Sequence, residues 1–126
     1  MNILASASQS IWWKIGGLSA ASAVGLGAFG SHGLKKKVSD PVKLDYWKTA
    51  SHYHLLHSIA IMMAPFSKNP NFAGVMFTSG VVLFSGSLYY MTVGQKKMGF
   101  VPPIGGVGLI AGWLALVLLD VELVER

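Results

Sequence analysis

A chain of 126 residues that is 52% hydrophobic and 12% charged has little surface suited to water, since a typical soluble domain is about 25% charged. Its net charge of +5 does not indicate nucleic acid, because half of the basic residues lie between Lys35 and Lys48, where they indicate membrane orientation and contact with anionic lipid. The absence of cysteine excludes disulfides, thiolate nucleophiles and iron–sulfur clusters held by cysteine.

Four uncharged stretches divide the chain, and each is 19 to 27 residues long. A helix needs about 20 residues to cross a hydrocarbon core of roughly 30 Å, and a charge inside that core is costly. These runs also lack the alternation of barrel strands. We therefore predict an all-α fold, an integral membrane four-helix bundle that forms a single transmembrane domain over residues 1–126. The predicted spans cover approximately residues 12–34, 49–67, 71–94 and 99–120.

Basic residues are distributed unevenly between the two ends of these spans. The first and third loops carry seven of them, whereas the two termini and the second loop carry three. The seven are Lys35, Lys36, Lys37, Lys43, Lys48, Lys96 and Lys97. By the positive-inside rule, these loops face the cytoplasm or the mitochondrial matrix. We expect a multi-pass protein with both termini on the outer side of a bacterial-type inner membrane, the mitochondrial inner membrane or another eukaryotic membrane.

The first span carries small residues at every fourth position, namely Gly17, Ala21 and Gly25, and the fourth span carries Gly108 and Gly112. Such faces let helix backbones approach closely in lipid. We therefore expect the first and fourth spans to pack tightly together, with a homodimer through the fourth span as the alternative. A cleaved signal sequence is a second interpretation of the first span. However, this run is longer than a signal core and its lysines follow it rather than precede it.

The longest connection leads into the second span through Ser39, Asp40 and Pro41. The first two are good helix caps, and proline suits the first helical position. We expect a short interfacial helix here that bends or runs directly into the second span.

Four histidines are the candidates for chemistry. His32 ends the first span, while His52, His54 and His57 begin the second, so topology gathers them at one side. His54 and His57 are three residues apart, a spacing that a metal can use together with His32. No cysteine or carboxylate lies on a span to complete such a site, and no catalytic motif is present. We therefore predict no metal, no cofactor and no enzymatic activity.

His57 differs from the other histidines in depth. Nine helical residues after Lys48 place it roughly 13 Å inside the inner boundary, where an ionisable group needs a partner or a cavity. The same count along the other spans reaches small or hydroxyl-bearing residues. The predicted polar layer consists of His57, Ser85, Ser87, Gly105 and Gly106. We expect His57 to be neutral, buried and hydrogen-bonded to Ser87 or Ser85, with a small ligand cavity as the alternative.

Four motifs in order give the chain a family resemblance. They are GAFGSHGL at 27–34, YHLLHS at 53–58, LFSGSLY at 83–89, and PIGG at 103–106 followed by Gly112 and Trp113. This pattern resembles the transmembrane protein 256 family, which includes small bacterial inner-membrane proteins and eukaryotic homologues. The resemblance implies a multi-pass membrane protein with no assigned activity.

Three functional classes remain open. A structural or assembly protein needs only packed helices, small-residue faces and a basic loop, so we favour it. A carrier for a small solute, a metal or a proton would use the polar layer around His57. A redox subunit would bind haem or quinone near His32, His54 and His57. The expected partners are the lipid bilayer and either another membrane protein or a second copy of the chain, and nucleic acid is not among them.

Overall fold

Helices form nearly all of the structure. The computed structural model describes residues 2–94 and 96–122. The helices are α1 (Ile3–Ser8), α2 (Ile11–Ser31), α3 (Pro41–Met63), α4 (Pro70–Val81), α5 (Ser87–Val93) and α6 (Val101–Val117). Two 3₁₀ turns, η1 (Leu34–Lys36) and η2 (Ala64–Phe66), and one π-helical turn, η3 (Val82–Gly86), complete the list. Over the described residues, β pairing is limited to one isolated bridge, so the predicted all-α fold is confirmed.

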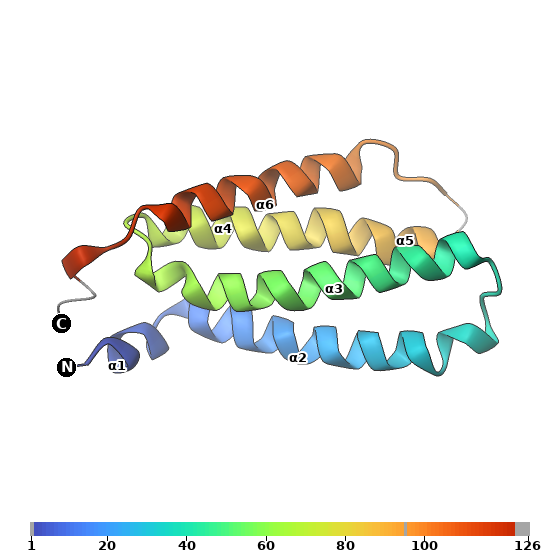
Figure 1. Ribbon diagram of the computed structural model, residues 1–126, viewed down its shortest axis with the longest axis horizontal. Helices are drawn as coiled ribbons and strands as arrows, with labels where there is room; N and C mark the ends of the chain where they lie inside the picture. Colours follow the sequence, from blue (N-terminus) through green and yellow to red (C-terminus); the bar gives the residue numbers. More distant parts are fainter. Residues whose placement is uncertain (1, 95, 123–126) are drawn as a thin grey trace.

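The long helices run antiparallel, so α1 and the end of α6 lie together at one end of the molecule (Figure 1). The connections after α2 and α5 lie at the opposite end, which we call the lysine-rich end because it carries Lys35, Lys36, Lys37, Lys96 and Lys97. Neighbouring helices in the chain are therefore neighbours in space. All the basic residues of the first and third loops are brought to one end.

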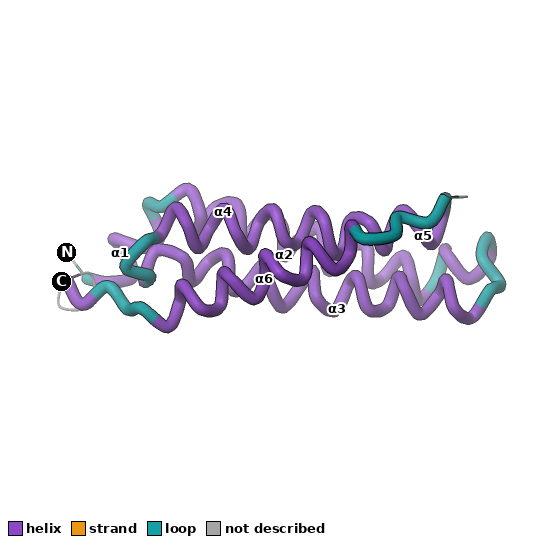
Figure 2. The backbone as a smooth tube through the Cα atoms, turned by 90° about the horizontal axis from the view of Figure 1, so that it is seen from above, coloured by secondary structure: helices purple, strands orange, loops and turns teal. Residues whose placement is uncertain are grey.

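Helices α3 and α4–α5 form the central pair of the structure. Figure 1 places α2 and α6 at opposite sides of this pair, and Figure 2 separates α3 from α4–α5 in the perpendicular view. Helix α2 packs mainly on α3, and α6 packs on α4 and the π-helical turn. The prediction that the first and fourth spans pack on each other is therefore wrong. A pattern of small residues indicates that another helix packs closely on that face, but it does not identify which helix does so.

Local sequence signals set the start of α3. The Asp40 carboxylate accepts a hydrogen bond from the Val42 backbone N–H at 3.0 Å, and Pro41 takes the first helical position. These residues satisfy or remove the first unpaired N–H groups. The helix continues without interruption to Met63, so the helix predicted before the second span runs directly into it.

Between α4 and α5 the helix widens into the π-helical turn, and this turn is a point of contact with two neighbours. Ser85 Oγ donates a hydrogen bond to the Ala50 carbonyl of α3 at 2.8 Å. On the other side, Gly105 of α6 lies so close that an added Cβ would overlap the backbone of Leu83 and Phe84. The absence of a side chain at Gly105 therefore lets α6 pack directly against the π-helical turn.

The connection between α3 and α4 holds the far end of α6. Ser67 Oγ donates to the Ala115 carbonyl at 2.9 Å, and the Lys68 N–H donates to the Leu118 carbonyl at 2.7 Å. Ser67 is fully buried at this point. These bonds satisfy carbonyls that the end of a helix leaves unpaired, and they fix the position of α6 relative to α4.

One continuous helix of the described residues, Pro70–Val93, is long and apolar enough to cross a membrane, with a mean hydropathy of 1.5. Helix α6 is apolar but shorter, because Gly99 adopts a left-handed φ of 54° and the helix begins only at Val101. Helices α2 and α3 carry the glycine, serine and histidine residues of the chain's polar contacts, and these lower their hydropathy.

Candidate functional site: two buried histidines

His57 is 4% exposed and has a partner for each ring nitrogen. The indole N–H of Trp113 donates to Nε2 at 2.9 Å, and Nδ1 lies 2.8 Å from the Tyr53 carbonyl. An indole can only donate, so Nε2 must offer its lone pair, and Nδ1 must carry the proton that the carbonyl accepts. His57 is therefore a neutral imidazole in one tautomer, and it joins α3 to α6.

The predicted bond from His57 to a hydroxyl of the third span is wrong. Ser85 donates instead to the Ala50 carbonyl, and Ser87 donates to the Phe84 carbonyl of its own helix at 2.9 Å. Both hydroxyls are buried at the π-helical turn, where they bond backbone carbonyls. The side-chain partner of His57 is instead Trp113 of α6.

Aromatic rings enclose the His57 imidazole. Tyr53 stacks on it with ring centroids 5.6 Å apart and planes 11° apart, while Trp113 and Phe77 approach at 5.7 and 6.1 Å. Phe77 also meets Trp113 edge to face at 5.3 Å. A hollow of about 580 Å³ lies beside this group between α3, the π-helical turn and α6, and it is lined mainly by apolar and aromatic side chains.

His54 forms a second polar group on another side of α3. Its Nδ1 lies 2.9 Å from the Tyr89 hydroxyl, and its Nε2 lies 3.3 Å from Ser22 Oγ. Ser22 donates its proton to the Ser19 carbonyl at 2.7 Å. Ser22 therefore accepts from Nε2–H, and Nδ1 shares a hydrogen bond with the Tyr89 hydroxyl. His54 joins α3 to α2 and α5.

Further hydroxyls continue this contact between α2 and α3. Ser58 donates to the His54 carbonyl at 2.6 Å, so the 2.6 Å contact between Ser19 and Ser58 has Ser19 as the donor. At the lysine-rich end, the Trp47 indole donates to the Leu26 carbonyl at 2.8 Å. The polar seam is our name for three contacts between α2 and α3: Ser19 with Ser58, Ser22 with His54, and Leu26 with Trp47.

The three histidines considered for a metal are not brought together. His32 is exposed and caps the end of α2, whereas His54 and His57 are held by separate partners. Within residues 2–94 and 96–122, no group of three or more His, Cys, Asp or Glu side chains is arranged to hold a metal ion.

The predicted packing glycines divide into two groups. Gly108 faces Gly80 of α4, with an added Cβ 3.5 Å from the Gly80 Cα, and Gly112 makes room for the Phe77 ring. Gly17 and Gly25 have open space around them, and Ala21 is exposed. The face of α6 that we considered for a homodimer is therefore occupied within the chain, while the small-residue face of α2 points outward. Gly106 lies beside the Phe84 ring at 3.9 Å from its added Cβ position.

Sequence reasoning missed several residues of these groups. They are Trp113, Tyr89, Ser19, Ser22 and Ser58. A weak signal existed for Ser19 and Ser22, which lie three residues apart and so share one face of the first span.

An all-helical chain that bonds its polar groups inside and turns Leu18, Val107 and Val117 outward, each at least 66% exposed, has the organisation of a membrane protein. The comparisons with known proteins agree with that class. The family described as "Protein of unknown function (DUF423)" matches residues 26–106. The chain belongs to this family, whose members named below are called UPF0382 membrane proteins.

The relatives come from bacteria and a yeast. A UPF0382 membrane protein of Staphylococcus aureus is 42% identical over 110 residues, which cover 82% of this chain and 89% of the relative. YwdK of Bacillus subtilis is 38% identical over 116 residues, covering 86% and 94%. A Schizosaccharomyces pombe relative is 36% identical over 113 residues, covering 82% and 96%. No solved structure matches. Membership supports a membrane location, and the family description assigns no function.

Proposed function

We propose that the protein crosses the membrane four times as one helical bundle and acts as a structural or assembly protein for other membrane proteins. The uncharged stretches of the four long helices and the charged loops at the ends of the molecule support the four crossings. The lysine-rich end then faces the cytoplasm or the mitochondrial matrix, and both termini face outward.

The observation that carries the assembly role is the outward face of α2. Gly17 and Gly25 have no neighbouring atom within 4 Å of an added Cβ, and Ala21 between them is exposed. In membranes, small residues are enriched where helices touch, because they let backbones approach. A small-residue face that carries no helix of its own chain suits a helix of another protein, with a second copy as one such partner.

The carrier and redox alternatives receive less support from the site. Either role at His54 or His57 would use a free ring nitrogen. Both nitrogens of His57 and both of His54 are bonded within the chain.

We also retain the transmembrane protein 256 family as the finer assignment. A family with members in bacteria and in a fission yeast is compatible with that resemblance. The four motifs also have structural uses: the first contains the Gly30 that makes room for Trp47, and the last contains Gly105 at the π-helical turn.

Affinity purification from native membranes tests the assembly role. We expect a defined membrane protein to be recovered in fixed stoichiometry with the wild type, and to be lost with Gly17→Leu combined with Gly25→Leu. Open space surrounds both glycines, so the fold should tolerate this change. Val107→Leu, at an exposed position of α6, is the matched control and should retain the partner. Recovery of the same partner with all three forms would contradict the proposed use of the α2 face.

A further inference from the structure

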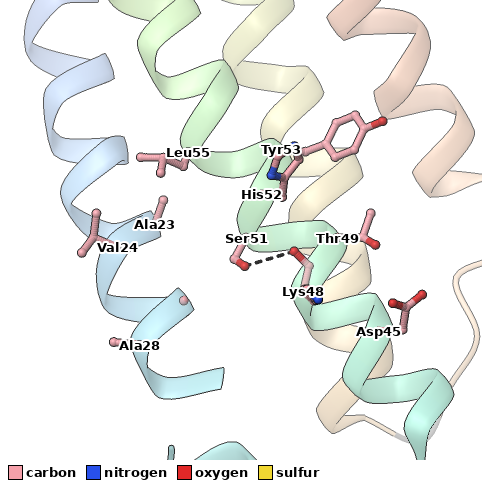
Figure 3. A pocket seen from close by; sticks show the side chains of 11 residues that line it. Ala23, Val24, Ala28, Asp45, Lys48, Thr49, Ser51, His52, Tyr53 and Leu55 are labelled. Carbon is pink, nitrogen blue, oxygen red and sulfur yellow. Dashed lines mark hydrogen bonds between the residues drawn. The ribbon is translucent and has the colours of Figure 1, made fainter. Parts of the chain in front are cut away.

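A cleft of about 610 Å³ lies between α2 and α3 toward the lysine-rich end (Figure 3). It lies between the contact of Ser22 with His54 and the lysine-rich end. Figure 3 shows Ala23 and Leu55 directed into the gap from the two sides, with Ser51 below them.

The wall of the cleft changes character along its length. At its deep end the lining is apolar and includes Ala23, Val24 and Leu55. Toward the lysine-rich end, Ser51 and Lys48 replace these side chains. Seven helical residues separate Leu55 from Lys48, so the change takes place over about 10 Å. An apolar region of this depth beneath a cationic rim matches a molecule with a hydrocarbon part and an anionic head.

An adjoining hollow of about 360 Å³ extends the rim and adds a second cation. It shares Gly27, Lys48 and Ser51 with the cleft and is also lined by Lys35, which follows α2. Lys48 of α3 and Lys35 of the 3₁₀ turn after α2 therefore both border the adjoining hollow. Asp45 belongs to the lining as well, but Figure 3 shows its carboxylate directed away from α2.

We propose that this cleft binds one anionic phospholipid from the leaflet at the lysine-rich end. The headgroup phosphate lies between Lys35 and Lys48, and an acyl chain lies against Ala23, Val24 and Leu55. Cationic side chains next to a helix end attract anionic lipid, and the apolar wall excludes free phosphate as the natural occupant. The inference rests on the proposed four crossings, which place this rim at a membrane surface.

Gly27 of α2 lines the cleft. An added Cβ there would meet only Ser51 Cβ, at 4.0 Å, so a Cβ fits without overlap, and the rest of a larger side chain would extend into the space that Gly27 lines. Gly27→Leu therefore fills the cleft while leaving every charge in place. Gly86→Leu adds the same side chain in open space at the π-helical turn, outside the cleft, and is its control.

The test is lipid retention by the full-length protein. The protein is reconstituted in phosphatidylcholine vesicles containing a minority of phosphatidylglycerol, extracted in mild detergent, and analysed by native mass spectrometry. We expect the wild type to retain one phosphatidylglycerol per chain. Lys35→Gln with Lys48→Gln should weaken retention roughly tenfold or more, because each surface lysine contributes measurably to anionic-lipid binding. Lys36→Gln with Lys37→Gln removes the same amount of charge next to Lys35, outside the lining, and should retain the lipid.

Gly27→Leu should lose the lipid and Gly86→Leu should keep it. Equal retention by all variants would overturn the proposal. Equal loss with both lysine pairs would also overturn it, because that result would indicate attraction to the basic residues in general. Equal retention of phosphatidylcholine, or displacement by an excess of inorganic phosphate, would also overturn it. If Gly27→Leu does not fold, the two lysine pairs still decide the result. Carbonate extraction tests membrane insertion and labelling of cysteines at Ser39 and Ser8 tests the crossings, so failure of the lipid site and failure of the four crossings are distinguishable.

Discussion

The two outer helices are attached to the central pair by different chemistry. Helix α6 meets α4 and the π-helical turn through glycines, with Gly108 on Gly80, Gly112 on Phe77 and Gly105 on the backbone of Phe84. Helix α2 approaches α3 closely at one end, where Gly16 lies against the Ser58 carbonyl, and is then held mainly by the hydrogen bonds of the polar seam.

The two helix pairs also differ in the space that remains between them. Glycine contacts leave no room for an added atom between α4 and α6, whereas a cleft remains between α2 and α3 beside Ser51. Close packing depends on shape and fails when an atom is added. A polar contact depends on partners and loses a smaller free energy when one is removed, because intramembrane hydrogen bonds average about 0.6 kcal/mol.

The largest effect should follow from adding one methyl group to the α6 contact. Gly105→Ala should reduce the free energy of unfolding in detergent by roughly 1–3 kcal/mol, because its Cβ meets backbone that cannot rotate away. Gly25→Ala is the control: it adds the same atom in open space and should leave stability unchanged or raise it by up to about 1 kcal/mol. Equal thermal stability of the two variants would remove the distinction between the attachments. Gly99 is a poor control, since its left-handed φ strains any side chain.

A smaller effect is expected in the polar seam. Ser58→Ala removes the acceptor for Ser19 and the donor to the His54 carbonyl, and should cost roughly 0.6–1.7 kcal/mol of unfolding free energy. Ser79→Ala removes bonds only to the Val75 and Met76 carbonyls of its own helix and should be near neutral. Denaturant titration of both variants makes the comparison. A Ser58→Ala variant as stable as Ser79→Ala would show that hydrogen bonds do not hold α2.

The smallest effect concerns the bond between His57 and Trp113. Trp113→Phe removes the indole N–H and retains an aromatic ring, while His57→Leu removes the acceptor. A double-mutant cycle of these changes should give a coupling of about 0.6 kcal/mol, and His57→Leu alone should cost about 1 kcal/mol or less. A coupling near zero would mean that the two side chains do not interact in the folded protein.

Local features of the fold were predictable from the sequence, while the partners of buried side chains were not. Asp40 and Pro41 act on the backbone next to them, so their role can be read without knowing the rest of the structure. The small residues at 108 and 112 indicate a close contact, yet any helix with a suitable groove satisfies that pattern. The π-helical turn at Val82–Gly86 shifts the residues after it and has no reliable sequence signal.

The partner of His57 was missed for a geometric reason. A count of nine residues from Lys97 reaches Gly106, but residues 98–100 are not helical and α6 begins at Val101. The true level of His57 on α6 therefore lies further along the chain. Side chains also lean toward the start of their helix, which brings the Trp113 indole back toward that level. A depth count is thus reliable only after the start of each helix is known.

Cysteine labelling from the two sides of the membrane tests the central claim most directly, namely that four helices cross with the lysine-rich end inside. The chain has no cysteine of its own, and Ser39 and Ser8 are both exposed at opposite ends of the molecule. A cysteine at Ser39 should react with a membrane-impermeant reagent only from the cytoplasmic or matrix side, and one at Ser8 only from the opposite side. Reaction of both from one side in a full-length chain would contradict four crossings, and reversed labelling would contradict the orientation.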